Sequence, residues 1–102
     1  MIIYNVTVKI ESAIKEDWED WMKTVHIPDV MATGLFNDAQ LRRLMIEEDD
    51  GCTFSIQYRC PSMEKFQEYQ SSHASKLQAE HTNRYKDRYV AFRTLMEQLE
   101  EY

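Results

Sequence analysis

The stretch CTFSIQYRC, residues 52–60, alternates apolar and polar side chains over its whole length. A period of two is typical of a β-strand that is buried on one face only. The acidic run EDDG, residues 48–51, precedes it and ends in the Asp-Gly pair that hairpin turns favour. We therefore predict a hairpin that joins a strand near residues 41–46 to the strand at 52–60.

A second alternating stretch, IIYNVTVKI, occupies residues 2–10 and predicts another half-buried strand. Between the two strands, apolar side chains recur at helical spacing, at Ile14, Trp18, Trp21, Met22 and Val25. Ser12 is a suitable N-cap for this helix. Pro28 predicts that the helix ends or kinks there, with a short further turn through residues 29–32 and a stop at Gly34.

After the strand at 52–60, the sequence predicts a second amphipathic helix, with Ser62 as its N-cap and an end near Thr82. A polar loop at 83–87, a last strand at 89–96 and an acidic tail follow. The predicted order is β-α-β-β-α-β in a single domain, residues 1–102. This is the α+β, ferredoxin-like arrangement, in which two helices cover one face of a four-stranded antiparallel sheet.

Charge and composition exclude several functional classes. The net charge is −6, from 18 acidic and 12 basic residues, which disfavours binding to nucleic acids and to anionic membranes. No apolar run reaches the ~20 residues that span a bilayer. The sequence starts directly with a strand pattern and shows no signal peptide, so we expect a cytoplasmic protein.

The two cysteines, Cys52 and Cys60, lie in the same predicted strand. At ~3.3 Å per residue their Cα atoms would be about 26 Å apart. A disulfide requires roughly 4.4–6.8 Å. We expect both to be buried, reduced thiols.

One face of the predicted sheet has no helix over it. We expect this open face to hold polar side chains together with three apolar ones that would start a contact with a second copy: Asn5, Thr7, Lys9, Thr53, Ser55, Gln57, Arg59 and Arg93, with Ile3, Ala91 and Leu95. The face is either hydrated or packed on a second copy about a two-fold axis. RNA binding is disfavoured, because the aromatic residues Tyr4, Phe54 and Tyr58 have the opposite parity.

Four stretches resemble a family of uncharacterised bacterial proteins within the dimeric α+β barrel superfamily: IIYNVTVKIE, HIPDVMATGLF, CPSMEKFQEYQ and LQAEHTNRYKDRYVAFRTL. The resemblance covers the whole chain and implies a homodimer with a pocket between helices and sheet in each subunit. The superfamily includes cofactor-free monooxygenases, haem-degrading oxygenases and lactone isomerases, and the fold alone does not choose among them.

The motif of the haem-degrading branch is an asparagine on the first strand, then a tryptophan and a histidine in the second helix. Asn5 and His81 are matches for the first and last positions. Tyr69 or Gln70 stands where the tryptophan would be. Haem binding is therefore the least favoured of the functions that the resemblance suggests.

His26 is the candidate catalytic residue, because an imidazole at a helix terminus can act as a general base near neutral pH. The alternative is a structural histidine that stabilises the turn before Pro28. The candidate ligand-binding residues are Tyr4, Trp21, Tyr58 and His73, which are suited to an apolar or aromatic molecule. The alternative for these aromatic residues is that they fill the core.

We expect no metal site and no cofactor. His73 and His81 are about 12 Å apart along a helix, too far for both to bind one ion at ~2.0–2.1 Å. The basic side chains Arg84, Lys86, Arg88 and Arg93 form a candidate anion site, although we favour the interpretation that they balance nearby carboxylates.

The sequence thus predicts a homodimeric small-molecule-binding α+β barrel, with a second copy and a small apolar or aromatic ligand as partners. A cofactor-independent reaction of the monooxygenase or isomerase type, with His26 as the base, is one hypothesis. The alternative is a non-catalytic homo-oligomeric assembly domain.

Overall fold

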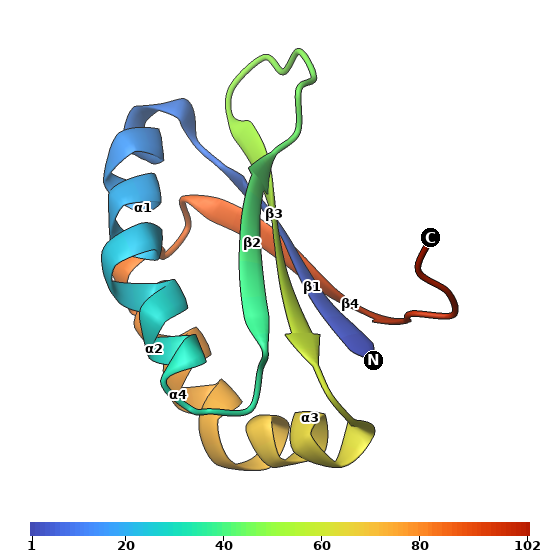
Figure 1. The fold of residues 1–102 in the computed structure, drawn as a ribbon. Coiled ribbons are helices and arrows are strands. Elements are labelled where there is room, and N and C mark those ends of the chain that lie inside the picture. Colours follow the sequence, from blue (N-terminus) through green and yellow to red (C-terminus); the bar gives the residue numbers. More distant parts are fainter.

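The computed structural model describes residues 1–102. The strands β1 (Ile2–Ile10), β2 (Asp38–Arg43), β3 (Cys52–Cys60) and β4 (Tyr89–Glu97) form one antiparallel sheet in the order β2-β3-β1-β4. All the helices lie on one side of this sheet (Figure 1). The predicted ferredoxin-like β-α-β-β-α-β fold is therefore confirmed.

The first helical segment is continuous through Pro28. A 3₁₀ turn (Ser12–Ile14) leads into α1 (Lys15–Trp21), a π-helical turn (Met22–His26) follows, and α2 (Ile27–Met31) completes the segment. The predicted end at Pro28 is wrong, because Ile27 keeps right-handed helical geometry, with φ −62° and ψ −45°. The regular α-helix is instead interrupted by the π-helical turn just before Pro28, and α2 corresponds to the predicted short further turn. Proline is tolerated here because it lies just after the π-helical turn, where the α-helical hydrogen-bond pattern is already interrupted and the missing N–H is least needed.

The N-terminal start of this segment also differs from the prediction. Glu11, not Ser12, occupies the position before the first turn, and no side chain caps it. The backbone N–H of Ile14 instead donates to the carbonyl of Glu11 at 3.2 Å. The tight 3₁₀ turn satisfies this end of the segment within the backbone, so a side-chain cap is not needed.

The second helical segment consists of α3 (Met63–Tyr69), a π-helical turn (Gln70–Ala74) and α4 (Ser75–Tyr85). Ser62 is its N-cap, as predicted, and its hydroxyl accepts from the Lys65 N–H at 3.3 Å. The helix continues to Tyr85, past the predicted end at Thr82. The chain then reverses at Asp87, which has a φ of 64°.

The strand β2 lies earlier in the chain than the predicted residues 41–46. Its start is held to β3 by the ion pair of Arg59 with Asp38, at 2.8 Å, and by the Asn37 N–H, which donates to the Arg59 carbonyl at 2.7 Å. The alternation at 41–46 extends beyond the residues that can pair with β3. Met45 and Ile46 are therefore exposed in a loop that reaches to Gly51, and this loop is longer than the predicted hairpin turn.

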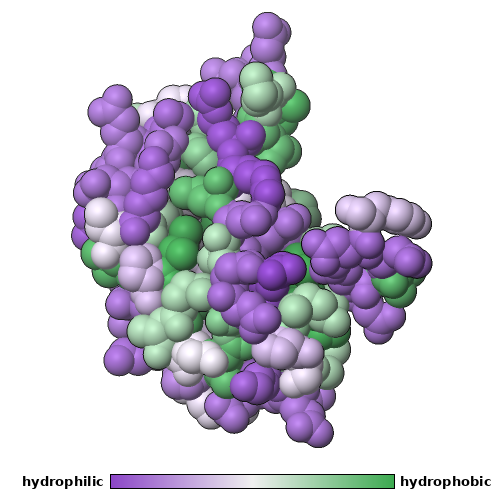
Figure 2. Space-filling model, in the orientation of Figure 1, coloured by the Kyte–Doolittle hydropathy of each residue, from purple (hydrophilic) through white to green (hydrophobic).

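The core lies between the sheet and the helices. Trp18 of α1 is fully buried and packs on Phe54 of β3, with ring centroids 4.7 Å apart. At the other end of the sheet an aromatic cluster fills the space under α3, formed by Tyr4, Phe36, Tyr58, Phe66 and Tyr69. Polar side chains cover most of the surface that Figure 2 shows, and apolar ones are visible in the crevice between the helices and β2.

The open face of the sheet has a different set of β4 residues from the predicted one. Val6 pairs with Arg93, and Val8 with Ala91. Because paired residues share a face, Arg93, Ala91 and Leu95 lie on the helix-covered face, and their predicted place on the open face is wrong. Ile3 lies on the open face as predicted, and the apolar residues that β4 contributes there are Val90, Phe92 and Met96.

Both cysteines are free thiols, and the continuous strand β3 keeps them apart. Cys60 is fully buried, whereas Cys52 is half-buried, so the burial prediction holds for Cys60 alone.

None of the helices combines the length and the apolar character needed to cross a lipid bilayer.

The two glycines give a matched test of the β2–β3 loop. A Cβ atom at Gly51 would lie 2.6 Å from the Ile10 carbonyl oxygen, and its φ is +141°. Gly34 has a φ of +76° and open space around it. We expect Gly51→Ala to lower the free energy of unfolding by about 2–4 kcal/mol and Gly34→Ala by about 1 kcal/mol. Urea denaturation measures both, and equal losses would contradict the close approach of this loop to β1.

Candidate functional site

A cavity lies between the helices and the sheet, open to solvent at one end. Its lining is mostly apolar, with a few polar side chains that converge on it. The sheet contributes Tyr4, Val6, Val8, Ile56, Tyr58, Tyr89, Ala91 and Arg93, and the helices contribute Met22, His26, Val30, Tyr69, Gln78 and His81. Such a composition is typical of small-molecule sites in proteins.

The cavity is narrow. It encloses about 450 Å³ up to and including its open mouth, but its free interior is only about 30 Å³. This interior has room for little more than a water molecule. A larger ligand would occupy the mouth and displace flexible side chains, of which Met22 is the most adaptable in the lining.

His26 is placed in the cavity by the π-helical turn at the end of α1. Its Nδ1 is buried and has no hydrogen-bond partner. Burial lowers the pKa of His26 to about 4, with Arg93 acting in the same direction and Asp29 against it. The ring is therefore neutral at pH 7 and has an unused polar atom next to the cavity.

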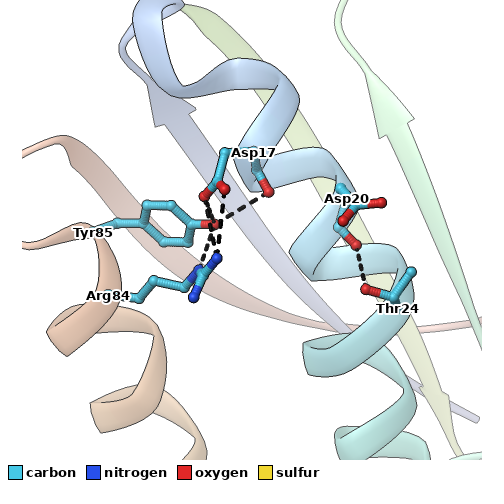
Figure 3. Close-up of polar contacts among 5 residues, drawn as sticks. All are labelled: Asp17, Asp20, Thr24, Arg84 and Tyr85. Atoms are coloured by element: carbon cyan, nitrogen blue, oxygen red, sulfur yellow. Dashed lines mark hydrogen bonds and ion pairs between the residues drawn. The ribbon is translucent and has the colours of Figure 1, made fainter.

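Trp21 packs against the His26 ring. The Trp21 and His26 rings are stacked, with centroids 5.0 Å apart. The Arg84 guanidinium lies over the Trp21 ring, 5.5 Å from its centroid. Arg84 is itself fixed by Asp17, which also accepts from the Tyr85 hydroxyl at 2.8 Å (Figure 3). This chain of contacts ties the end of α4 to α1 and orients His26.

His81 is a second buried imidazole in the same lining. Its Nε2 accepts a hydrogen bond from the Trp18 indole N–H at 2.9 Å, so its own proton is on Nδ1. The pKa of His81 is lowered to about 4, mainly by burial and to a smaller extent by the neighbouring His26 and by Arg93. The two imidazole rings are 5.8 Å apart. Each disfavours protonation of the other, which adds to the effect of burial.

The tyrosines of the cavity are neutral hydrogen-bond donors. Burial raises the pKa of Tyr4, which Arg93 and Gln78 partly offset, and burial also raises the pKa of Tyr58 and of Tyr69. None of them ionises at physiological pH. The polar part of the cavity thus combines neutral hydroxyls, neutral imidazoles and one cation.

The structure brings together some of the residues proposed from the sequence. His26, Tyr4 and Tyr58 line the cavity, and Trp21 lies directly behind His26. His73 does not share this space: it lies in a separate polar groove between α2 and α4, with Asp29, Lys76 and Glu80. Each residue at 70–74 rotates through a smaller angle about the helix axis than an α-helical count assumes, because that turn is π-helical.

Gln78 and Tyr69 line the cavity but were not proposed as site residues from the sequence. Arg93 was named only as part of a basic cluster, in which Arg84 and Arg88 do pair with carboxylates. His81 entered only through its match to the haem-degrading motif. The spacing of Leu77 and His81, four residues apart on one helix face, was the available signal. For Arg93 no local signal existed, because its face depends on how β4 pairs with β1.

The haem-degrading motif is not assembled in this structure. Asn5 lies on the open face of the sheet, where its side chain accepts from the Ser55 hydroxyl at 2.7 Å and donates to Thr7 at 3.0 Å. It therefore points away from the cavity that contains His81. The residues present do not fit the arrangement that a haem would need, and we derive no reaction through haem.

The fold defines the class of protein as a ferredoxin-like α+β domain, here with a cavity between helices and sheet. The chain belongs to the DUF4286 family, a domain of unknown function, whose model matches residues 1–99. This agrees with the resemblance described above. No curated protein matches the sequence.

Several solved structures share the fold at low sequence identity. A dimeric ferredoxin-like protein from an uncultured marine organism is 11% identical, with a TM-score of 0.75, over 100% of this chain and 98% of that one. A candidate antibiotic biosynthesis monooxygenase from Bacillus cereus is 12% identical, with a TM-score of 0.69, over 99% and 95%. The haem-degrader MhuD from Mycobacterium tuberculosis, with two haems bound, is 14% identical, with a TM-score of 0.73, over 100% and 99%.

The two buried histidines predict how stability depends on pH. Their pKa is about 4 in the folded protein and 6.5 in the unfolded chain. The unfolded state therefore binds more protons between these values, and the free energy of unfolding falls as the pH drops from 6.5 to 4. The loss is on the order of a few kcal/mol for the pair.

Urea denaturation between pH 7 and 4.5 measures this slope. His81→Gln keeps an acceptor for Trp18 but removes the titrating ring, so we expect a shallower slope than in the wild type. The constant loss of stability that the substitution causes cancels when slopes are compared. Parallel profiles for the two proteins would contradict the assignment.

Proposed function

We propose that the protein is a homodimer that binds a small, partly aromatic or apolar molecule in the cavity of each subunit, with His26 as the group that accepts a proton or hydrogen bond from it. The observation that supports this most directly is the buried, unpartnered Nδ1 of His26 beside the cavity. A buried polar atom without a partner is unfavourable by about 1–3 kcal/mol. A ligand with a hydroxyl or an acidic C–H group would supply the missing contact.

The chemistry follows from the neutral state of His26. Its pKa of about 4 makes it a weaker base than the ordinary imidazole expected from the sequence, so proton transfer to it depends on stabilisation of the ion pair that forms. In the tautomer with the proton on Nε2, the Nδ1 lone pair is free to accept. When a proton moves from the ligand to Nδ1, its electron pair stays on the ligand as an enolate or phenolate. The resulting imidazolium and anion attract each other strongly in surroundings of low dielectric constant. This step needs no cofactor and is common to isomerisation and to the first stage of cofactor-independent oxygenation.

The structural relatives are consistent with this proposal. A protein of the same fold from Bacillus cereus is described as a candidate antibiotic biosynthesis monooxygenase, and MhuD is described with haems in its active site. Both descriptions concern those proteins, which are too distant to transfer an activity. MhuD is thus one protein of this fold that has organic molecules in its active site.

The dimer is supported by the open face of the sheet. Val90 is 67% exposed and Phe92 is 63% exposed, although both lie in a regular strand. Together with Ile3 and Met96 they form an apolar strip on a face with no helix over it. In a dimer with a two-fold axis, this strip of one copy would face the same strip of the other, and both would be buried.

The dimer has a direct test. Phe92→Glu places a charge in the apolar strip and is expected to give a monomer at micromolar concentration, measured by size-exclusion chromatography with light scattering. Val25→Glu is the control, because Val25 is an exposed apolar residue on the helical layer, on the other side of the protein. A wild-type protein that is monomeric, or a dimer that Phe92→Glu leaves intact, would refute the proposed interface.

A non-catalytic assembly domain is the second candidate function. The observation in its favour is the small free interior of about 30 Å³. In that case the aromatic residues serve to pack the core, and the open face of the sheet is the functional surface.

Ligand binding distinguishes the two candidates. A thermal-shift screen of small phenols, β-diketones and aryl carboxylates is expected to give hits, because a bound ligand raises the stability of the folded state. His26→Leu should lower the affinity of the hits about tenfold. His73→Leu, which removes the same ring outside the cavity, should leave it unchanged. A screen without hits would favour the assembly function, and equal effects of the two substitutions would refute the role of His26.

A further inference from the structure

We propose that Arg93 anchors the ligand through an oxyanion, so that the cavity selects small apolar molecules with a single carboxylate, phenolate or enolate group. This inference rests on the proposed function, because it specifies the chemical class of the molecule that the cavity binds. It goes beyond that function in assigning the selectivity to one cation of β4.

The position of Arg93 makes it central to the cavity. It lies opposite Val6 on the helix-covered face of the sheet and lines the cavity. Tyr4 of β1 and three groups of the helical layer, namely His26, Tyr69 and His81, line the same cavity. The positive charge of Arg93 acts on all four. The guanidinium is therefore close to polar groups of both layers, at the place where a ligand between them would lie.

Arg93 has no negative partner in this structure. Three other arginines form ion pairs, Arg59 with Asp38, Arg84 with Asp17 and Arg88 with Glu11. Arg93 forms none, and no aspartate or glutamate lines the cavity. The histidines are neutral at pH 7, as described above. The cavity therefore has one positive charge, although the whole protein has a net charge of −6.

This imbalance favours a monoanionic ligand. A fork of N–H donors matches the two oxygens of a carboxylate or the single oxygen of an enolate. Arg93 is an exposed residue, so solvent moderates this attraction. The neutral hydroxyl of Tyr4, beside Arg93, is an additional donor. The apolar lining suits a hydrocarbon body, and one cation is too little for a phosphate or another multiply charged ligand.

Benzoate and benzamide provide a matched pair of probes, since they differ in charge but hardly in shape. Calorimetry of the full-length protein should show that benzoate binds roughly five- to tenfold more tightly than benzamide. Arg93→Gln should abolish the preference, and Arg93→Lys should retain part of it. Arg88→Gln changes the net charge equally outside the cavity and should leave the preference unchanged. Circular dichroism verifies that all variants are folded.

A second probe distinguishes phenolates from carboxylates. The absorbance of para-nitrophenol reports its ionisation, and binding beside Arg93 should lower its apparent pKa, whereas Arg93→Gln should remove this shift. If benzoate is preferred but the pKa of para-nitrophenol is not shifted, the proposal holds for carboxylates alone. A shift of the phenol without a preference for benzoate limits it to phenolates and enolates in the same way.

Three results would overturn the inference. Equal binding of benzoate and benzamide with an unshifted phenol would refute anion selection while leaving the proposed binding function intact. A preference that persists in Arg93→Gln would assign the selectivity to other residues. Failure of all three probes to bind would count against the inference and the binding function together.

Discussion

The buried hydrogen bond from the Trp18 indole to His81 connects the two helical segments over the sheet. Trp18 is fully buried, and its partner is one of the few buried polar side chains of the protein. Because an unpaired indole N–H in this position would be unfavourable, α1 and α4 are held in one relative position. That position also determines where the π-helical turn after α1 presents His26, and so the shape of the cavity.

The polar groups of the cavity form a coherent set because burial affects each of them in the same sense. It keeps both histidines neutral, since an imidazolium would lose its hydration, and it keeps the tyrosines protonated for the corresponding reason. Arg93 remains the only charge. The site thus has neutral donors and acceptors around one cation, an arrangement that is suited to recognising an anion or to stabilising one as it forms.

Two deviations from the sequence-based prediction of the helices arise where the backbone geometry is irregular. The two π-helical turns, at residues 22–26 and 70–74, add a residue to the local helical repeat. The first permits the helix to continue through Pro28, and the second directs His73 into a groove away from the cavity. Apolar periodicity reports an average α-helical repeat, and it does not reveal a single widened turn.

The alternating stretches at 2–10 and 52–60 and the amphipathic helices were sufficient to determine the ferredoxin-like fold, because one buried face per element permits few arrangements. The places of Tyr4, Tyr58 and His26 at the helix–sheet interface also followed from these patterns. The position of Arg93 depended on the tertiary structure. The residues of β4 have no strict alternation, and only its register with β1 assigns each side chain to a face.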